Sequence, residues 1–182
     1  EPDEQVRLDF MWGRPSTGRL ADYIERMAAP FREGQIIEVN LDAIAWLEGL
    51  SQAMRRGFLV TIDYGDLALH LCGADRAAGT LRSFYKHRLV DSPLERIGEQ
   101  DITASVNFTA LIEYGRDFGF ETISYERQTA FLIRMGLIER VAAMHDAGGS
   151  VDDLKKRLAV KNLFVPGGVS DNFRVLIQKL RA

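Results

Sequence analysis

The chain has 182 residues and a formal net charge of -3 at pH 7, with 46% of its residues hydrophobic and 27% charged. These values are typical of one globular domain with a buried core, and they give no broad basic field for nucleic acid or anionic lipid. A single cysteine, Cys72, excludes an internal disulfide, and three scattered histidines lack zinc-binding spacing. No apolar run approaches the roughly 18 residues of a membrane span. We therefore expect no membrane partner and, from the histidine and cysteine spacing, no metal.

The first residues of the chain show neither an initiator methionine nor the features of a signal peptide. The chain begins at Glu1 without a methionine, and its first ten residues lack the basic and apolar regions of a signal peptide. We therefore expect a processed or excised piece of a longer protein, and the single cysteine fits a reducing compartment.

The residues up to Gly57 predict two strands and two helices. Alternating apolar and charged residues indicate a half-buried edge strand from Gln5 to Met11. Helical spacing then predicts an amphipathic helix from Leu20 to about Pro30. A short strand over Gln35 to Val39 follows, and Asn40 is placed to cap a helix that ends before Gly57. With the next strand, this order predicts a β-α-β unit.

The central prediction is a strand from Phe58 to Ile62, which is short, almost wholly apolar and bounded by glycines. Such a run is typical of a parallel strand buried on both faces. Asp63, Tyr64 and Gly65 follow it directly. Because ligands bind at the carboxyl ends of strands in open α/β sheets, we expect the chemistry of this chain at these three residues.

The span from Asp66 to about Ala104 shows no sustained period, and we interpret it as an ordered, functional lid, since its apolar and aromatic residues argue against disorder. Gly119 then marks the end of a helix. The elements predicted after the lid are a helix over Asn107 to Asp117, a strand over Phe120 to Arg127, helices over Thr129 to Ala147 and Val151 to Leu163, and a last strand over Phe173 to Leu180.

Glycine-rich nucleotide motifs are absent or defective. The run Gly13 to Leu20 has the outline of a phosphate-binding loop, but Arg19 replaces its lysine and Leu20 its hydroxyl residue, so a plain turn is the better interpretation. No Gly-x-Gly-x-x-Gly or Gly-x-Gly-x-Gly element occurs in the sequence.

Asp63 and Tyr64 are the first candidates for catalysis, because a carboxylate and a phenol can orient a substrate amine or hydroxyl. The structural alternative is that Asp63 caps a turn and Tyr64 packs beneath the lid. In the lid, His87 is a candidate general base or a backbone anchor. Arg82 either binds an anionic group or pins the lid through Asp63 or Asp101.

Longer motifs stand in a fixed order along the chain, namely EVN-x-x-A-x-x-WLEGLS before the central strand, then DYG, TLR-x-F-x-x-H, D-x-T-x-x-V-x-F and RQTAFLIRMGL. This order resembles the carboxyl-terminal half of the MidA-like methyltransferases. These are bacterial and mitochondrial relatives of the complex I assembly factor that methylates an arginine of a respiratory subunit.

The resemblance implies a Rossmann-like, class I methyltransferase sheet of the α/β class that uses S-adenosylmethionine. Phe58 to Ile62 would be its fifth strand, Phe120 to Arg127 its sixth, and Phe173 to Leu180 its antiparallel seventh, preceded by inserted helices. It also implies a bacterial cytoplasmic or mitochondrial matrix location. The residues that match the family motifs are Asp63, Tyr64 and Gly65 in DYG, and Arg82, His87, Asp101, Thr103 and Phe108 in the lid pattern.

One large part of the family pattern is missing. Family members carry a glycine-rich cofactor turn, an acidic residue and an Asn-Glu-Phe-Phe-Asp element ahead of the region present here, and this sequence has none of them. We therefore expect residues 1–182 to be a single, substrate-facing domain that binds no cofactor by itself. The edge left along Phe58 to Ile62 would receive the missing segment or a partner chain.

The sequence thus predicts part of a methyltransferase that acts on a protein side chain, with arginine favoured. A non-enzymatic assembly or interaction module is the alternative. A small hydrolase that uses His87 and Asp63 is a third possibility, which the lack of a Gly-x-Ser-x-Gly nucleophile disfavours.

Overall fold

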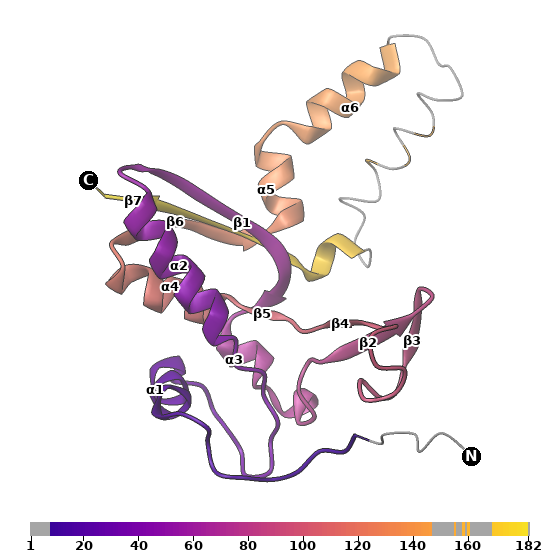
Figure 1. Cartoon of the computed structure of the whole chain (residues 1–182). Coiled ribbons are helices and arrows are strands. Elements are labelled where there is room, and N and C mark those ends of the chain that lie inside the picture. Colours follow the sequence, from indigo (N-terminus) through magenta and orange to yellow (C-terminus); the bar gives the residue numbers. More distant parts are fainter. Residues whose placement is uncertain (1–7, 147–154, 156–157, 159, 161–168, 182) are drawn as a thin grey trace. The chain divides into compact units, whose positions relative to one another are not determined.

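The computed structural model describes residues 8–146, 155, 158, 160 and 169–181 (Figure 1). The chain divides into two compact units. The first holds the residues up to Leu41 together with Ala68–Ser105, and the second holds Asp42–Leu67 together with the residues from Val106 onward. None of the described helices is long and apolar enough to cross a bilayer.

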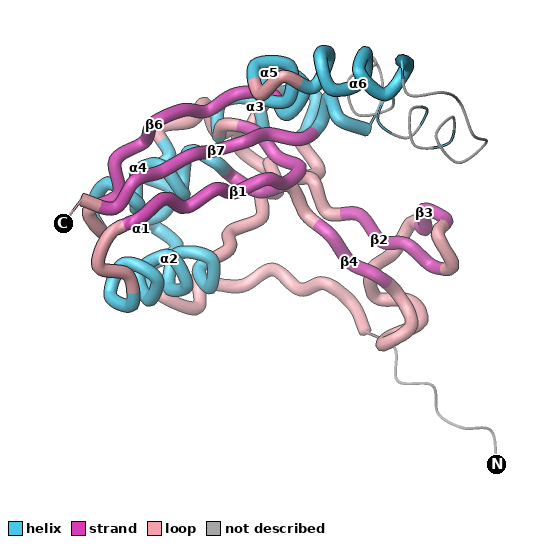
Figure 2. The backbone as a smooth tube through the Cα atoms, turned by 90° about the horizontal axis from the view of Figure 1, so that it is seen from above, coloured by secondary structure: helices cyan, strands magenta, loops and turns pink. Residues whose placement is uncertain are grey.

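The second unit is built on a four-stranded sheet with the order β5-β1-β7-β6. Its strands are β1 (Gly57–Asp66), β5 (Val106–Asn107), β6 (Phe120–Arg127) and β7 (Phe173–Leu180). Figure 2 shows β6, β7 and β1 side by side, with β7 antiparallel to both neighbours. β5 runs parallel to β1 and pairs only with its last two residues. The predictions of the last two long strands, and of an antiparallel final strand, are confirmed.

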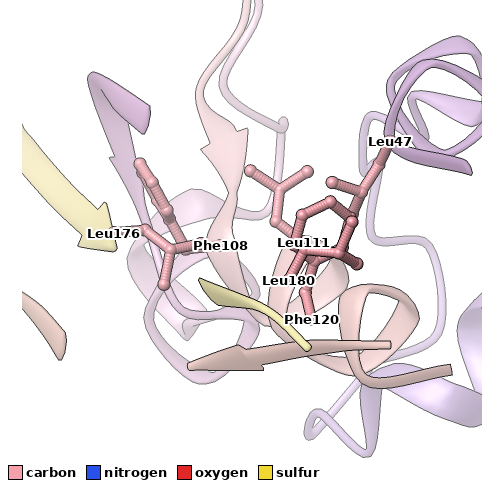
Figure 3. Close-up of a cluster of buried hydrophobic side chains, with 6 residues drawn as sticks. All are labelled: Leu47, Phe108, Leu111, Phe120, Leu176 and Leu180. Carbon is pink, nitrogen blue, oxygen red and sulfur yellow. The ribbon is translucent and has the colours of Figure 1, made fainter. Parts of the chain in front are cut away.

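Two helices cover one face of this sheet, α2 (Leu41–Ala53) and α4 (Phe108–Asp117). The Asn107 side chain accepts a hydrogen bond from the Ala110 amide, which satisfies one free N–H at the start of α4. Gly119, with φ of +89°, follows the helix as predicted. The side chains that form the buried core are Leu47, Phe108, Leu111, Phe120, Leu176 and Leu180 (Figure 3).

The prediction that the central strand is buried on both faces is wrong. Successive side chains of β1 lie on opposite faces, and those that share a face with Phe58 are all exposed, namely Phe58 (62%), Val60 (48%), Ile62 (48%) and Tyr64 (42%). Leu59, on the other face, packs against the core. Apolar composition therefore predicted the strand correctly, but one of its faces has no cover among the described residues.

Gly65 allows β5 to approach β1 closely. A Cβ atom at this position would lie 2.0 Å from the Val106 carbonyl oxygen, which is far inside van der Waals contact. Any other residue would force the two strands apart.

The first unit contains helix α1 (Gly18–Met27), which Thr17 caps as its side chain accepts from the Arg19 amide. The predicted first helix is thereby confirmed. The span interpreted as an irregular lid also has regular structure, including an antiparallel sheet in the order β3-β2-β4 that the sequence did not predict. Its elements are α3 (Ala68–Leu71), η1 (Ala74–Arg76), β2 (Arg82–Tyr85), β3 (Arg88–Val90) and β4 (Asp101–Thr103).

Two early strand predictions are wrong. Gln35–Val39 is not a strand, so no β-α-β unit precedes β1. In place of a ladder of hydrogen bonds to a neighbouring strand, the Ile36 amide donates one hydrogen bond to the Ala77 carbonyl at 2.9 Å. Residues 8–11 are exposed and form no strand, while residues 5–7 lie outside the described residues.

The helix predicted from Thr129 to Ala147 is two helices, α5 (Gln128–Arg134) and α6 (Leu137–Asp146). Gly136, with φ of +83°, separates them because a left-handed residue cannot continue a right-handed helix. Ala147 and most of the helix predicted over Val151–Leu163 lie outside the described residues. Both helices precede β7, which confirms the prediction of inserted helices.

Replacement of Gly65 tests the close approach of β5. We expect Gly65→Ala to lower the free energy of unfolding by about 2 kcal/mol, because its methyl group overlaps the Val106 carbonyl. Gly49→Ala is the matched control, since a Cβ there meets nothing within 4 Å inside helix α2; it should stabilise by up to about 1 kcal/mol. Chemical denaturation measures both changes, and equal effects would contradict the described contact.

Candidate functional site

The carboxyl end of β1 presents four consecutive residues, Asp63, Tyr64, Gly65 and Asp66. Asp63 Oδ1 accepts a hydrogen bond from the Tyr64 amide at 2.8 Å. The Tyr64 ring meets the Phe173 ring edge-on, with 4.8 Å between the centroids, and keeps 42% of its surface exposed. The strand end thus carries a carboxylate and an accessible phenol at consecutive positions, with their side chains on opposite faces of the strand.

Asp66 lies at the centre of a partly buried polar network that joins three strands. Its Oδ2 accepts from Arg174 Nη2 on β7 at 2.6 Å, and its Oδ1 accepts from the Tyr125 hydroxyl on β6 at 3.0 Å. Oδ1 also accepts from the Leu67 amide at 2.8 Å. Only 19% of the Asp66 side chain and 12% of the Arg174 side chain are exposed.

This network shifts the pKa of the Asp66 carboxyl group and of the Tyr125 hydroxyl group. Burial by itself would raise the pKa of Asp66, but hydrogen bonds from the Leu67 amide, Arg174 and Tyr125 outweigh it and hold that pKa below its ordinary value of 3.8. Burial, and then the neighbouring Asp66 charge, raise the pKa of Tyr125 well above its ordinary value. Tyr125 is therefore protonated at neutral pH and donates a hydrogen bond to Asp66, so it does not act as a base.

Phe108, which matches the lid motif in sequence, is the first residue of α4 and fully buried. Its ring lies 5.4 Å from the Tyr125 ring. The structure thus places Phe108 in the core of the second unit, directly beside the Asp66 network.

The other lid candidates all lie in the first unit, on its small sheet. Arg82 stands opposite Thr103 across β2 and β4, and Asp101 stands opposite Phe84. Because opposite and alternate residues share a face, Arg82, Asp101 and Thr103 are brought to one face of this sheet. His87 lies apart from them, in the turn between β2 and β3, and is exposed.

A single carboxylate holds the chain at the start of β2. Glu38 accepts hydrogen bonds from the Thr80 amide at 2.8 Å, from the Thr80 hydroxyl at 2.8 Å and from the Leu81 amide at 3.0 Å. Thr80 Oγ1 in turn accepts from the Ser105 amide at 3.0 Å. Glu38 thereby fixes the backbone directly before Arg82.

The sequence did not identify Asp66, Tyr125, Arg174 or Glu38 as site residues. Asp66 closes the run FLVTIDYGD, so the strand-end rule could have included it. No spacing connects it to Tyr125 and Arg174, which are 59 and 108 residues away in the chain.

One hollow of the second unit lies away from this strand end. Its volume is about 500 Å³, and it is open to solvent at the start of β6 and the end of β7. The residues that line it are Ile112, Arg116, Gly119, Phe120, Glu121, Thr122 and Arg181. None of them is a residue that the sequence predicted for the site.

A family model described as "Putative S-adenosyl-L-methionine-dependent methyltransferase" matches residues 1–126. The chain belongs to this family. It is also similar to the crystal structure of a COG1565 superfamily member from Burkholderia thailandensis bound to S-adenosyl-homocysteine, with 26% identity and a TM-score of 0.79. A second, high-resolution native crystal structure of a COG1565 superfamily protein from that organism gives the same identity and TM-score.

The similarity to both structures covers 97% of the chain, but only 45% and 46% of theirs. The chain thus spans less than half the length of the solved structures that it matches. A comparison with curated proteins gives no match. The Rossmann-like α/β fold and the methyltransferase family that the sequence motifs predicted are confirmed.

The residues present do not by themselves fit the adenosyl cofactor. The glycine at the end of β1 forms no cradle, because the Val106 backbone fills the space at its Cα. The sequence also has no glycine-rich turn of the dinucleotide or adenosyl type. We therefore assign no residue of this chain to the methyl donor.

Removal of the Asp66 charge tests the network. We expect Asp66→Asn to lower the free energy of unfolding at neutral pH by about 2 kcal/mol, because the pair with Arg174 is partly buried. The pKa of Asp66 is lowered by folding, so this stabilisation is present above 3.8 and lost as the pH falls through the lowered pKa. Urea denaturation of both proteins should show their stabilities converging in acid.

Glu121→Gln is the control for that experiment. Its pair with Arg181 is also made at 3.1 Å, but 42% and 70% of the two side chains are exposed, so we expect little change at any pH. A constant difference between the wild type and Asp66→Asn from neutral pH into acid would contradict the role given to the Asp66 charge.

Proposed function

We propose that this chain supplies the substrate-facing part of an S-adenosylmethionine-dependent methyltransferase that modifies an arginine side chain of a protein. The observation that carries the proposal is the carboxylate of Asp63 at the end of β1, in a chain whose family is described as putative S-adenosylmethionine-dependent methyltransferases. The methyl donor would be bound by residues outside these 182.

The chemistry of the strand end fits a guanidinium. An arginine side chain is planar, permanently charged and rich in donors, so a carboxylate is its natural partner. The end of β1 already holds such a pair internally, between Asp66 and Arg174. Asp66 is therefore occupied, which leaves Asp63 as the acidic residue for a substrate.

Asp63 retains acceptor capacity for this role. Its Oδ1 accepts from the Tyr64 amide, and within the described residues no ion pair neutralises its charge. A substrate guanidinium held there would be fixed in orientation and could give up a proton to the carboxylate. The Tyr64 ring, in contact with Phe173, is on the opposite face of β1, so Asp63 alone is assigned to the guanidinium.

The open edge of β1 supports the proposal that the rest of the protein joins here. Along Gly57–Tyr64, β1 pairs with β7 on one side, whereas β5 meets only its last two residues on the other. Open, apolar strand edges are paired or covered in stable proteins. The expected occupant is the segment that completes the length of the related structures, or a partner chain.

The resemblance to a complex I assembly factor supports a respiratory subunit as the methylated protein. The enzyme would then work in the bacterial cytoplasm or the mitochondrial matrix. The second candidate is a non-enzymatic assembly module, which the lack of a glycine-rich turn and the exposed apolar face of β1 favour.

Substitution of Asp63 tests its role. We expect Asp63→Asn, made in the complete protein, to lower the turnover of a protein substrate by about 100-fold, because the amide holds a guanidinium less well and accepts no proton. Affinity for S-adenosylmethionine should change little. Steady-state methylation and calorimetry provide the two measurements.

Asp22→Asn is the matched control, since Asp22 is an exposed carboxylate on helix α1. It should leave both quantities unchanged. Equal losses of turnover and cofactor affinity in Asp63→Asn would remove Asp63 from a substrate role.

The location of the cofactor site can be tested by comparing the 182 residues with the complete protein. We expect S-adenosylmethionine to bind the complete protein and not the 182 residues, because these contain no glycine-rich turn. The amides of β1 should also exchange with solvent faster in the 182 residues, since one edge of the strand is open. Cofactor binding by the 182 residues alone would overturn this part of the proposal, and its absence from the complete protein would favour the assembly module.

A further inference from the structure

The hairpin of β2 and β3 presents cations that no carboxylate neutralises. Between Arg82 and Val90 the sequence has three basic residues and no acidic one, in a chain with a net charge of -3. Arg82, Lys86 and Arg88 are all exposed. Within the part of the chain that the structure describes, none of the three forms an ion pair.

The turn of this hairpin is made from residues that do not favour its geometry. Tyr85 pairs with Arg88, so Lys86 and His87 form a two-residue loop, with φ of 49° and 63°. Loops of this kind are normally Asn-Gly, because a left-handed backbone is strained in residues with a larger side chain. Strain of this kind gathers at functional positions. The side chains at the tip are therefore better explained by a contact that they make than by turn formation.

Tyr85 orders two cations before any partner binds, one from the hairpin and one from the segment after it. The Lys86 Nζ lies 5.1 Å and the Arg96 Cζ 4.7 Å from the centroid of its ring. Both distances are within the range of cation–π attraction. Side chains held in this way lose less conformational entropy on binding than free ones.

Large apolar side chains are exposed in the same segment. Leu89 is 65% and Ile97 60% exposed. Asp91 and Glu95 lie between them in sequence and are exposed as well. Exposed leucine and isoleucine suit a peptide, whereas the phosphate backbone of a nucleic acid offers them no apolar partner. The mixture therefore favours a protein partner with both acidic and apolar residues.

We propose that this surface docks an acidic, apolar segment of the protein substrate. The docking surface, called the hairpin cluster, consists of Lys86, His87, Arg88, Arg96 and Ile97 around Tyr85, with Arg88 directly opposite Tyr85 on the same face of the small sheet. The proposal rests on the proposed function only in naming the partner as the substrate. Its contribution is selection of the protein by charge, separate from the chemistry at Asp63.

Peptide binding to the complete protein tests the hairpin cluster. The probe is a short fluorescent peptide of glutamate and leucine with one arginine, and its counterpart has every glutamate replaced by glutamine. We expect the acidic peptide to bind more tightly by fluorescence anisotropy, and added salt to weaken it. The double variant Lys86→Glu, Arg88→Glu should raise its Kd by about 10-fold or more.

The matched control is Arg55→Glu, Arg56→Glu, which makes the same change of net charge at two exposed arginines before β1. It should change the Kd by less than about twofold. Equal losses in the two variants, or equal binding of the acidic and neutral peptides, would overturn the proposal. Tighter binding of an oligothymidylate than of the acidic peptide would also overturn it, in favour of nucleic acid. Thermal melting checks that both variants are folded.

Methyl transfer distinguishes failure of this proposal from failure of the proposed function. If the complete protein methylates its substrate but both double variants do so with the same KM, the hairpin cluster is not a docking surface and the function stands. If the complete protein transfers no methyl group but binds the acidic peptide through the hairpin cluster, the function fails and the docking surface belongs to an assembly module.

Discussion

Strand β7 is the constraint on which the second unit depends, because it hydrogen-bonds to β1 on one side and to β6 on the other along nearly its whole length. Its register sends Leu176 and Leu180 into the core under α2 and α4. A slip of one residue would turn both leucines to the opposite face of the sheet. The same register brings Arg174 to Asp66, so the core and the polar network are fixed by one strand pairing.

Elements whose signals are local could be predicted from the sequence. The helix from Phe108 and the strands from Phe120 and Phe173 are each indicated by a helix cap, a glycine or a hydrophobic period within or directly beside the element. The sheet of the first unit could not be predicted, because strands of three or four residues are too short to show a period. The strand prediction over Gln35–Val39 failed for a related reason, since its apolar residues have no partner strand among the described residues.

The position of Asp63–Gly65 at the end of a strand could be predicted from the sequence, whereas contacts that depend on tertiary pairing could not. Asp66 and Arg174 come together only through the register of β1 and β7. The burial of β1 was mispredicted because an apolar run has the same composition whether or not its cover lies in the same chain. The position of a residue directly after a strand thus makes it a candidate for the site. Its hydrogen-bonding partners can be identified only from the fold.

The separation of β1 and β7 in the chain also affects how the protein is made. Asp66 and Arg174 are 108 residues apart, so β1 emerges from the ribosome long before the strand that pairs with it. In that interval a strand with Phe58, Val60 and Ile62 on one face is free to associate with other nascent chains. The long pairing of β1 with β7 must therefore wait for residues 173–180, which makes it a late step in the folding of the second unit.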